Sequence, residues 1–204
     1  MTIAIERLGV VPFEPTWRAM QAMTRNRGPD DPDQLWLLQH PPVYTLGLAG
    51  KPEHLLDAGN IPVVKTDRGG QVTFHGPGQV VAYLLLDLRR LGFGVKELVR
   101  RLEQALIDTL AEFSLAGARR AGMPGVYVDD AKIAAIGLRV SRGCTYHGIA
   151  LNVDMDLAPF AGINACGYPG LATTSMAALG VRASIDAVQK RLESRLLAVL
   201  AAHS

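Results

Sequence analysis

The residues of this chain that could do chemistry are concentrated in one glycine-rich stretch. Residues 68–79 read Arg-Gly-Gly-Gln-Val-Thr-Phe-His-Gly-Pro-Gly-Gln, and a continuous apolar run follows from Val80. Glycine lets the backbone approach a ligand closely, and successive free N–H groups on such a turn suit an anion or a developing oxyanion. Arg68 adds a positive charge at the start of the stretch. Because polar groups beside a core strand need hydrogen-bond partners, we interpret the stretch as a candidate substrate site in preference to two ordinary turns.

Cys166 is the candidate nucleophile. It lies in the loop Ile-Asn-Ala-Cys-Gly-Tyr-Pro-Gly of residues 163–170, whereas a structural thiol is usually flanked by apolar residues in a helix or strand. This context alone leaves a structural and a functional role equally open. Cys144 precedes a predicted strand, and we interpret it as structural. Two cysteines do not make a disulfide framework.

Lys132 begins an otherwise apolar segment that extends to Leu138. Taken alone, it is most simply a lysine at the end of a strand that points into water. The alternative is that its ammonium stabilises a nearby thiolate, since a neighbouring cation brings the pKa of a cysteine from ~8.5 toward neutrality. His75 and His147 each precede a glycine, and neither has a second His or Cys at metal-ligand spacing, so we expect no metal site. A Cys–His pairing stays open.

These residues must be positioned by a sheet covered with helices. The patterns predict strands over residues 3–11, 34–39, 61–65, 80–88, 125–128, 132–140 and 145–153. They predict helices over residues 15–25, 95–113 and from Ser184 onward, with Ser184 as the N-cap, and a short helical turn over residues 52–57. Residues 45–50 and 157–174 are predicted as loops. Strands come mostly in runs, which indicates an α+β fold with a mixed, largely antiparallel sheet packed by helices. With no linker or change in composition, we expect a single domain over residues 1–204.

Composition excludes several classes of function. Apolar residues make up 49% and charged residues 20% of the chain, and the net charge of +2 gives no reason to expect nucleic-acid or membrane binding. Neither a membrane span nor a signal sequence is evident, so we expect a cytoplasmic protein. Three arginine doublets, Arg89-Arg90, Arg100-Arg101 and Arg119-Arg120, could form a local patch for an acidic partner, although solvated surface is the simpler interpretation.

Four segments together resemble the lipoyl(octanoyl) transferase family. They are residues 68–79 with Tyr83, Lys132–Gly137, His147–Val153 and Ala165–Gly167, in the order and spacing of that family. The resemblance implies an α+β fold similar to the catalytic domains of biotin protein ligase and lipoate–protein ligase. It also implies an acyltransferase that moves an octanoyl group from octanoyl-acyl carrier protein to a lysine of lipoyl domains, the first step of endogenous protein lipoylation. The acceptors would be the lipoyl domains of 2-oxoacid dehydrogenase complexes and the glycine cleavage H protein.

The resemblance also implies roles for individual residues. Cys166 would accept the acyl group as a thioester, and Lys132 would lower its pKa. The residues that would line the substrate pocket are Arg68, Gly69, Gly70, Gln71, Val72, Thr73, Phe74, His75, Ala135, Ile136, Gly137, Gly148, Ile149 and Ala150. N–H groups of the glycine loops could hold the oxyanion. A thioester is already activated, so no ATP, other cofactor or metal is expected. We expect a monomer.

Three other functions fit parts of the sequence. An ATP-dependent lipoate–protein ligase would share the fold but would not require a nucleophilic cysteine. A non-catalytic module that binds lipoyl domains or the acyl carrier would not require Cys166 or Lys132. A cysteine hydrolase that releases free fatty acid would differ only in the group that attacks the acyl-enzyme, water in place of lysine.

Overall fold

The computed structural model describes residues 3–201, apart from the side chain of Cys166. The bounds of seven of its strands are β1 Ile3–Val10, β2 Asp33–Gln39, β6 Gln79–Leu85, β7 Ala118–Arg120, β8 Met123–Val128, β9 Ala131–Ser141 and β10 Cys144–Asn152. They form one sheet in the order β1-β2-β6-β10-β9-β8-β7. β1 runs parallel to β2, and the other neighbouring pairs are antiparallel. The expected mixed, largely antiparallel sheet is confirmed.

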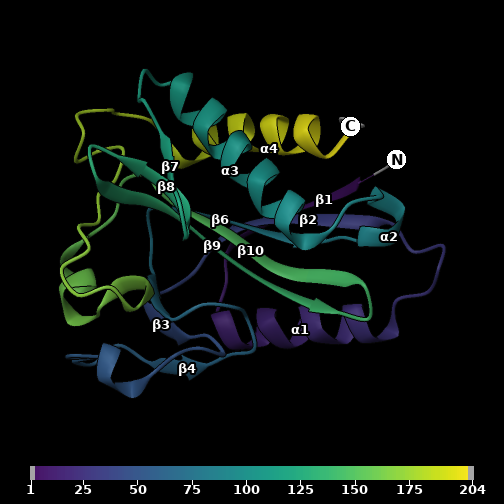
Figure 1. Ribbon diagram of the computed structural model, residues 1–204, viewed down its shortest axis with the longest axis horizontal. Coiled ribbons are helices and arrows are strands. Elements are labelled where there is room, and N and C mark those ends of the chain that lie inside the picture. Colours follow the sequence, from purple (N-terminus) through teal and green to yellow (C-terminus); the bar gives the residue numbers. More distant parts are fainter. Residues whose placement is uncertain (1–2, 202–204) are drawn as a thin grey trace.

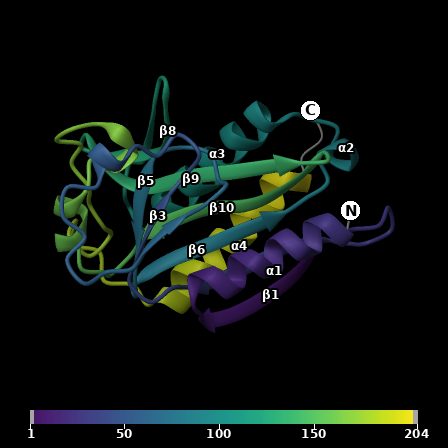
Figure 2. The same cartoon turned by 90° about the horizontal axis from the view of Figure 1, so that it is seen from below.

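Helices cover both faces of this sheet. Their bounds are α1 Phe13–Asn26, α2 Leu88–Leu91, α3 Val95–Ala111 and α4 Ile185–Ala201. Figure 1 shows α3 and α4 on one face and α1 on the other. Turning the molecule brings α1 and a second, smaller sheet to the front (Figure 2). In the described part of the chain, no helix is long and apolar enough to cross a membrane.

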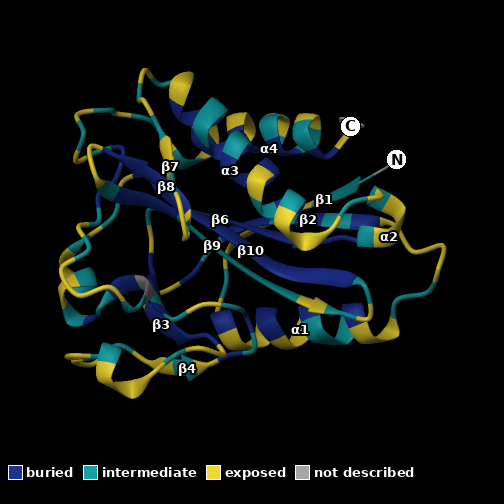
Figure 3. Cartoon of the chain, viewed as in Figure 1, coloured by how far each residue is buried: buried dark blue, intermediate teal, exposed yellow. Residues whose placement is uncertain are grey.

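Central strand β6 explains the long apolar run of the sequence. Its alternate residues Val80, Ala82 and Leu84 pack into the core under α3 and α4. The intervening residues Val81, Tyr83 and Leu85 pack into the core under α1. A strand that is covered on both faces has no polar alternation, which is why the run is continuous. In Figure 3 the neighbouring strand β10 is buried along its whole length, whereas β9 is only partly buried.

Helix α3 packs as its periodicity predicts. Leu98, Leu102, Leu106 and Leu110 are fully buried, and each such side chain contributes ~1.5–3 kcal/mol through the removal of apolar area from water. Arg101 is also buried, and its Nε donates to Glu97 Oε1 at 2.8 Å, as the spacing of one turn predicts. At the start of α4, Ser184 Oγ accepts a hydrogen bond from the amide of Ala187 at 3.2 Å, so the predicted N-cap is confirmed.

The smaller sheet was only partly predicted. It consists of β3 Val43–Leu46, β4 Val63–Lys65 and β5 Val72–His75, in the order β4-β3-β5. Residues 45–50 were predicted as a loop, but Thr45 and Leu46 belong to β3 because β4 and β5 give this short segment ladder partners on both sides. Short elements such as β7 and α2 were also not predicted. The loop after β10 is correct apart from the 3₁₀ turns η2 Ala158–Gly162 and η3 Ala165–Gly167, and η1 Pro52–His54 is the predicted helical turn.

Candidate active site

A cavity of about 350 Å³ lies where the smaller sheet and α1 meet β9 and β10. Nearly all of the residues that the sequence assigned to a substrate pocket line it. They are Arg68, Gly69, Gly70, Gln71, Val72, Thr73, His75, Ala135, Ile136, Gly137, Gly148, Ile149 and Ala150. Lys132, which was expected to act in catalysis, also lines the cavity. Phe74 does not, because strand alternation turns its ring away from Thr73 and His75 and onto Tyr44 and Phe160, at ring-centroid distances of 5.5 and 5.6 Å.

Small residues make the floor of this cavity. In the β9–β10 ladder, Ala135 lies opposite Ala150 and Gly137 lies opposite Gly148. Side chains of this size leave a narrow slot above the two strands. Gly148 also has a structural reason to be glycine, since a Cβ there would lie 2.0 Å from the carbonyl oxygen of Ala82. The pairing of β10 with β6 therefore requires glycine at this position of the floor.

Lys132 lies in the cavity and does not point into water. The residue is buried, and its Nζ donates to the carbonyl oxygen of Pro124 at 2.8 Å. Its ammonium also lies 5.3 Å from the centre of the Tyr127 ring. Gly125, at φ +126°, makes room for it, because a Cβ there would lie 2.6 Å from Lys132 Cε. The simpler interpretation of this lysine, as a solvated strand end, is wrong.

Cys166 belongs to η3, but its side chain lies outside the described part of the structure. Its neighbours in sequence lie beside the cavity. Ala165 and Lys132 line a common small cavity of about 20 Å³, and a Cβ on Gly167 would lie 2.9 Å from Gln71 Cγ. Downstream of η3, the backbone of Lys132 donates to Ala172 at 2.8 Å and accepts from Thr174 at 3.0 Å. The fold thus holds the cysteine loop against the strand that carries Lys132.

Arg68 holds the glycine-rich loop in place. Its Nη2 donates to the carbonyl oxygen of Thr45 at 2.6 Å and to the Thr45 hydroxyl at 2.9 Å. Its Nη1 donates to the carbonyl oxygen of Gly69 at 3.0 Å. The Gly69 amide in turn donates to the carbonyl oxygen of Leu138 on β9 at 2.8 Å. This amide is therefore occupied by β9, and an oxyanion would have to find its donors elsewhere in the loop.

Asp67, which the sequence reasoning missed, joins three parts of the site. It accepts hydrogen bonds from Trp17 Nε1 at 2.8 Å, Gln21 Nε2 at 2.9 Å and His147 Nε2 at 3.0 Å, and also from the Tyr146 hydroxyl. Burial by itself would raise the pKa of this carboxyl, but the four hydrogen bonds outweigh burial and hold the pKa well below its usual range. Its position directly before the Arg68 stretch was the available signal.

Three histidines gather at the α1 side of the cavity. His147 has a φ of +60° inside β10, and burial lowers its pKa despite the bond to Asp67. His40 donates from Nδ1 to the carbonyl oxygen of Val11 at 2.7 Å, so its Nε2 accepts from the Tyr83 hydroxyl at 2.7 Å. Burial lowers the pKa of His40 to about 4 and that of His75 to about 3, which makes both rings neutral.

A chain of side-chain amides orients His75. Asn152 Nδ2 donates to the carbonyl oxygen of Thr174 at 2.9 Å, so Asn152 Oδ1 faces Gln79 and accepts from its Nε2 at 2.9 Å. Gln79 Oε1 consequently accepts from His75 Nδ1 at 2.7 Å. Because a neutral imidazole carries one proton, His75 Nε2 is left as a hydrogen-bond acceptor. The backbone carbonyl of Thr174 thus fixes the tautomer of His75, which lines the cavity.

The arginine doublets are engaged within the molecule. Their ion pairs are Arg89–Asp87, Arg90–Asp33, Arg100–Glu97, Arg101–Glu97, Arg119–Glu103 and Arg120–Asp130. This pairing favours the structural interpretation of the doublets over a docking patch. Cys144 is buried, and no group of three or more His, Cys, Asp or Glu side chains within the described residues could hold a metal ion.

The fold is that of the catalytic domains that lipoate and biotin protein ligases contain. A bipartite lipoate protein ligase from Thermoplasma acidophilum superposes with a TM-score of 0.78 at 17% identity, covering 98% of this chain and 84% of the other. Biotin protein ligase from Aquifex aeolicus superposes with a TM-score of 0.58 at 12% identity, covering 97% and 68%. At these identities the likeness shows the fold alone.

Sequence comparison places the chain within this class. The chain belongs to the family of the lipoyl protein ligase A/B catalytic domain, whose model matches residues 12–197. It is 62% identical to the octanoyltransferase of Thiobacillus denitrificans over 96% of this chain and 89% of the relative. It is 60% identical to the octanoyltransferase of Laribacter hongkongensis, over 92% and 91%.

Proposed function

We propose that this protein transfers an octanoyl group to protein lysines in lipoylation, through an acyl thioester on Cys166. The observation that carries the proposal is the buried Lys132, which sits at one end of a narrow slot beside the loop of Cys166. The name octanoyltransferase, which relatives at 56–62% identity bear, supports the acyl group and the reaction class. The donor would be octanoyl-acyl carrier protein, and the acceptor a lysine of a lipoyl domain.

In the first half-reaction, the Cys166 thiolate attacks the carbonyl carbon of the carrier thioester. The tetrahedral intermediate collapses, and the bond between this carbon and the carrier sulfur breaks. The Lys132 ammonium gives its proton to the departing thiolate, so the carrier leaves as a thiol. An octanoyl-Cys166 thioester and a neutral Lys132 amine remain, which is a ping-pong scheme.

In the second half-reaction, the neutral amine of the acceptor lysine attacks the octanoyl-Cys166 carbonyl. A C–N bond forms and the bond to the Cys166 sulfur breaks. The Lys132 amine takes the proton that the nitrogen loses, which restores the ammonium beside a thiolate. One buried lysine thus carries the proton in both half-reactions. No ATP is consumed, because the carrier thioester is already activated.

The test is intact-protein mass spectrometry after the protein is mixed with octanoyl-acyl carrier protein in the absence of ATP. We expect an octanoyl adduct that peptide mapping places on Cys166 and that a lipoyl domain discharges. Cys144→Ser, the matched control, should keep the adduct, and Cys166→Ser should lose it. Acceptor modification that requires ATP and free octanoate would identify a ligase and exclude the proposed role of Cys166. The single catalytic domain, the monomeric state and the cytoplasmic location stay predictions.

A further inference from the structure

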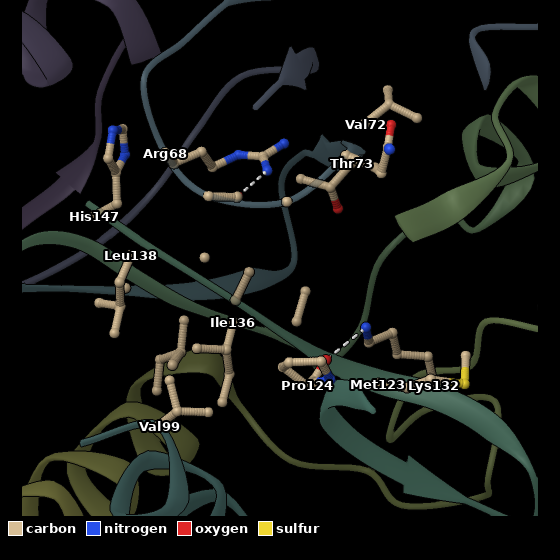
Figure 4. Close-up of a pocket in the computed structure, with 18 of the residues that line it drawn as sticks. Arg68, Val72, Thr73, Val99, Met123, Pro124, Lys132, Ile136, Leu138 and His147 are labelled. Carbon is tan, nitrogen blue, oxygen red and sulfur yellow. Dashed lines mark hydrogen bonds between the residues drawn. The ribbon is translucent and has the colours of Figure 1, made fainter. Parts of the chain in front are cut away.

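The slot has a defined direction. Figure 4 shows Lys132 at one end of the cavity and His147 at the other, with Arg68 and Thr73 along one side between them. All four residues line the same cavity. An acyl group whose carbonyl reacts beside Lys132 would therefore extend its methyl end toward His147.

The length of the floor matches an eight-carbon chain. Along β10 the floor extends from Ala150, opposite Ala135, to His147, opposite Leu138. Three residues of a strand span about 10 Å at ~3.3 Å per residue. An extended octanoyl chain measures about 9 Å from carbonyl carbon to methyl, given C–C bonds of ~1.5 Å. Two further carbons would reach beyond the floor into the residues at its far end.

Phe13 is the centre of the wall at that far end. It is the first residue of α1, it is buried, and it lines the cavity. Its ring centroid lies 5.2 Å from that of His40, 6.0 Å from that of His75 and 6.5 Å from that of His147. Tyr83 adds a further ring against His147 at 6.0 Å. Four rings thus cluster around Phe13, and three of them, those of His75, Tyr83 and His147, line the cavity with it.

This wall is held rigidly. Trp17, one helical turn after Phe13, donates to Asp67 at 2.8 Å, and His147 donates to the same carboxylate at 3.0 Å. Gln21, a turn further along α1, makes a third bond to it at 2.9 Å. Moving α1 away from β10 would break hydrogen bonds to a charged group, so the wall resists displacement by a longer chain.

We propose that Phe13 sets the acyl-chain length that this protein accepts, by closing the end of the slot opposite Lys132. The proposal rests on the proposed acyl transfer and adds to it the residue that limits the donor. Because a pocket discriminates only modestly among chains shorter than itself, the limit acts chiefly against chains longer than eight carbons.

The experiment measures kcat/KM for transfer from hexanoyl-, octanoyl-, decanoyl- and dodecanoyl-acyl carrier protein to a lipoyl domain. Phe13→Leu, which shortens the wall, should raise the decanoyl-to-octanoyl ratio roughly tenfold, since each added buried CH₂ is worth about fourfold in affinity. Phe13→Trp, which extends the wall into the slot, should shift the preference toward hexanoyl. Phe113→Leu is the matched control, because Phe113 packs against the core and does not line the cavity.

The outcomes separate the two proposals. Opposite shifts in the two Phe13 variants, with an unchanged profile in the control, support the role of Phe13. An octanoyl preference that is the same in the wild type and both variants overturns it and leaves the transferase intact. A wild-type protein that transfers no acyl group from any of the four donors overturns the transferase itself. Thermal unfolding of each variant shows that it is folded under the assay conditions.

Discussion

The carboxylate of Asp67 accepts a hydrogen bond from His147 Nε2 at 3.0 Å, and this pair joins the glycine-rich loop to strand β10. Because an ionised carboxylate only accepts hydrogen bonds, His147 must carry a proton on Nε2. The bond keeps the ring in the cavity although the backbone of His147 adopts a left-handed conformation, which costs a non-glycine residue free energy. Asp67 thus stabilises both the local backbone and the end of the slot.

Replacing this carboxylate should loosen the site. In Asp67→Asn, the amide group faces at least one of the four donors with its own N–H₂, so one or more bonds are lost. We expect the free energy of unfolding to fall by about 1–3 kcal/mol, as measured by urea denaturation. Asp186→Asn is the control, because its ion pair with Lys190 is exposed and should matter little. Equal stability of the two variants would show that the Asp67 bonds do not brace the fold.

Lys132→Met should remove most of the acyl transfer. The variant keeps a long side chain beside Tyr127 and Pro124 but lacks the proton carrier of both half-reactions. A positioned acid or base contributes ~10²–10⁴-fold, and we expect kcat to fall by about that factor with a smaller change in KM for the carrier. Stopped-flow and steady-state transfer assays measure both. Lys190→Met, on an exposed helix face, should be unaffected, and a Lys132→Met enzyme with the same kcat would exclude the proton-transfer role.

The elements that carry the site could largely be predicted from the sequence, because their signals are local. The apolar run from Val80 predicted the central strand. The spacing of the leucines predicted helix α3 and also which of its faces is buried. The glycine-rich stretch, together with the segments now seen as β9 and β10, predicted much of the cavity lining through its match to a known family pattern. Strand β3 was missed since four residues followed by glycine carry little signal, and pairing with β4 and β5 decides their structure.

The remaining parts of the site depend on contacts between distant residues. Phe13 lies far from residue 147 in sequence, and only the packing of α1 on β10 brings the two rings together. Lys132 illustrates the same limit, because its burial follows from Gly125 and from the carbonyl of Pro124 on the neighbouring strand. Phe74 is the opposite case. Family resemblance assigned it to the pocket, whereas alternation along β5, which is readable from the sequence, places it on the other face.

The buried histidines predict a loss of stability in acid. Burial holds the pKa of His40 at about 4 and that of His75 at about 3, whereas an unfolded histidine has a pKa of ~6.5. Between about pH 6.5 and pH 4 the unfolded chain therefore binds protons that the folded chain does not, so stability falls as the pH falls through this window. Each histidine contributes up to about 1.4 kcal/mol per pH unit.

Urea denaturation at several values between pH 7 and pH 4 measures this slope. His40→Asn keeps a side-chain N–H that can donate to Val11 but has no titratable group, so its stability should depend less steeply on pH than that of the wild type. The difference between the two slopes isolates His40 from the carboxylates, which titrate at lower pH. Parallel slopes would show that His40 is not held neutral by the fold.

The amide chain from Asn152 to His75 gives a prediction about a single proton. In Gln79→Glu, a carboxylate faces His75 Nδ1 and favours the charged imidazolium, so the pKa of His75 should rise from its low value of about 3. Side-chain ¹⁵N chemical shifts recorded across a pH titration report both this pKa and the nitrogen that carries the proton. Gln104→Glu, on α3, serves as the control and should leave the His75 signals unchanged.

In the wild type we expect the His75 proton on Nδ1, since the Thr174 carbonyl can only accept and so orients each amide after it. A proton on Nε2 would mean that Asn152 and Gln79 are both turned the other way, with Asn152 Oδ1 facing a carbonyl oxygen.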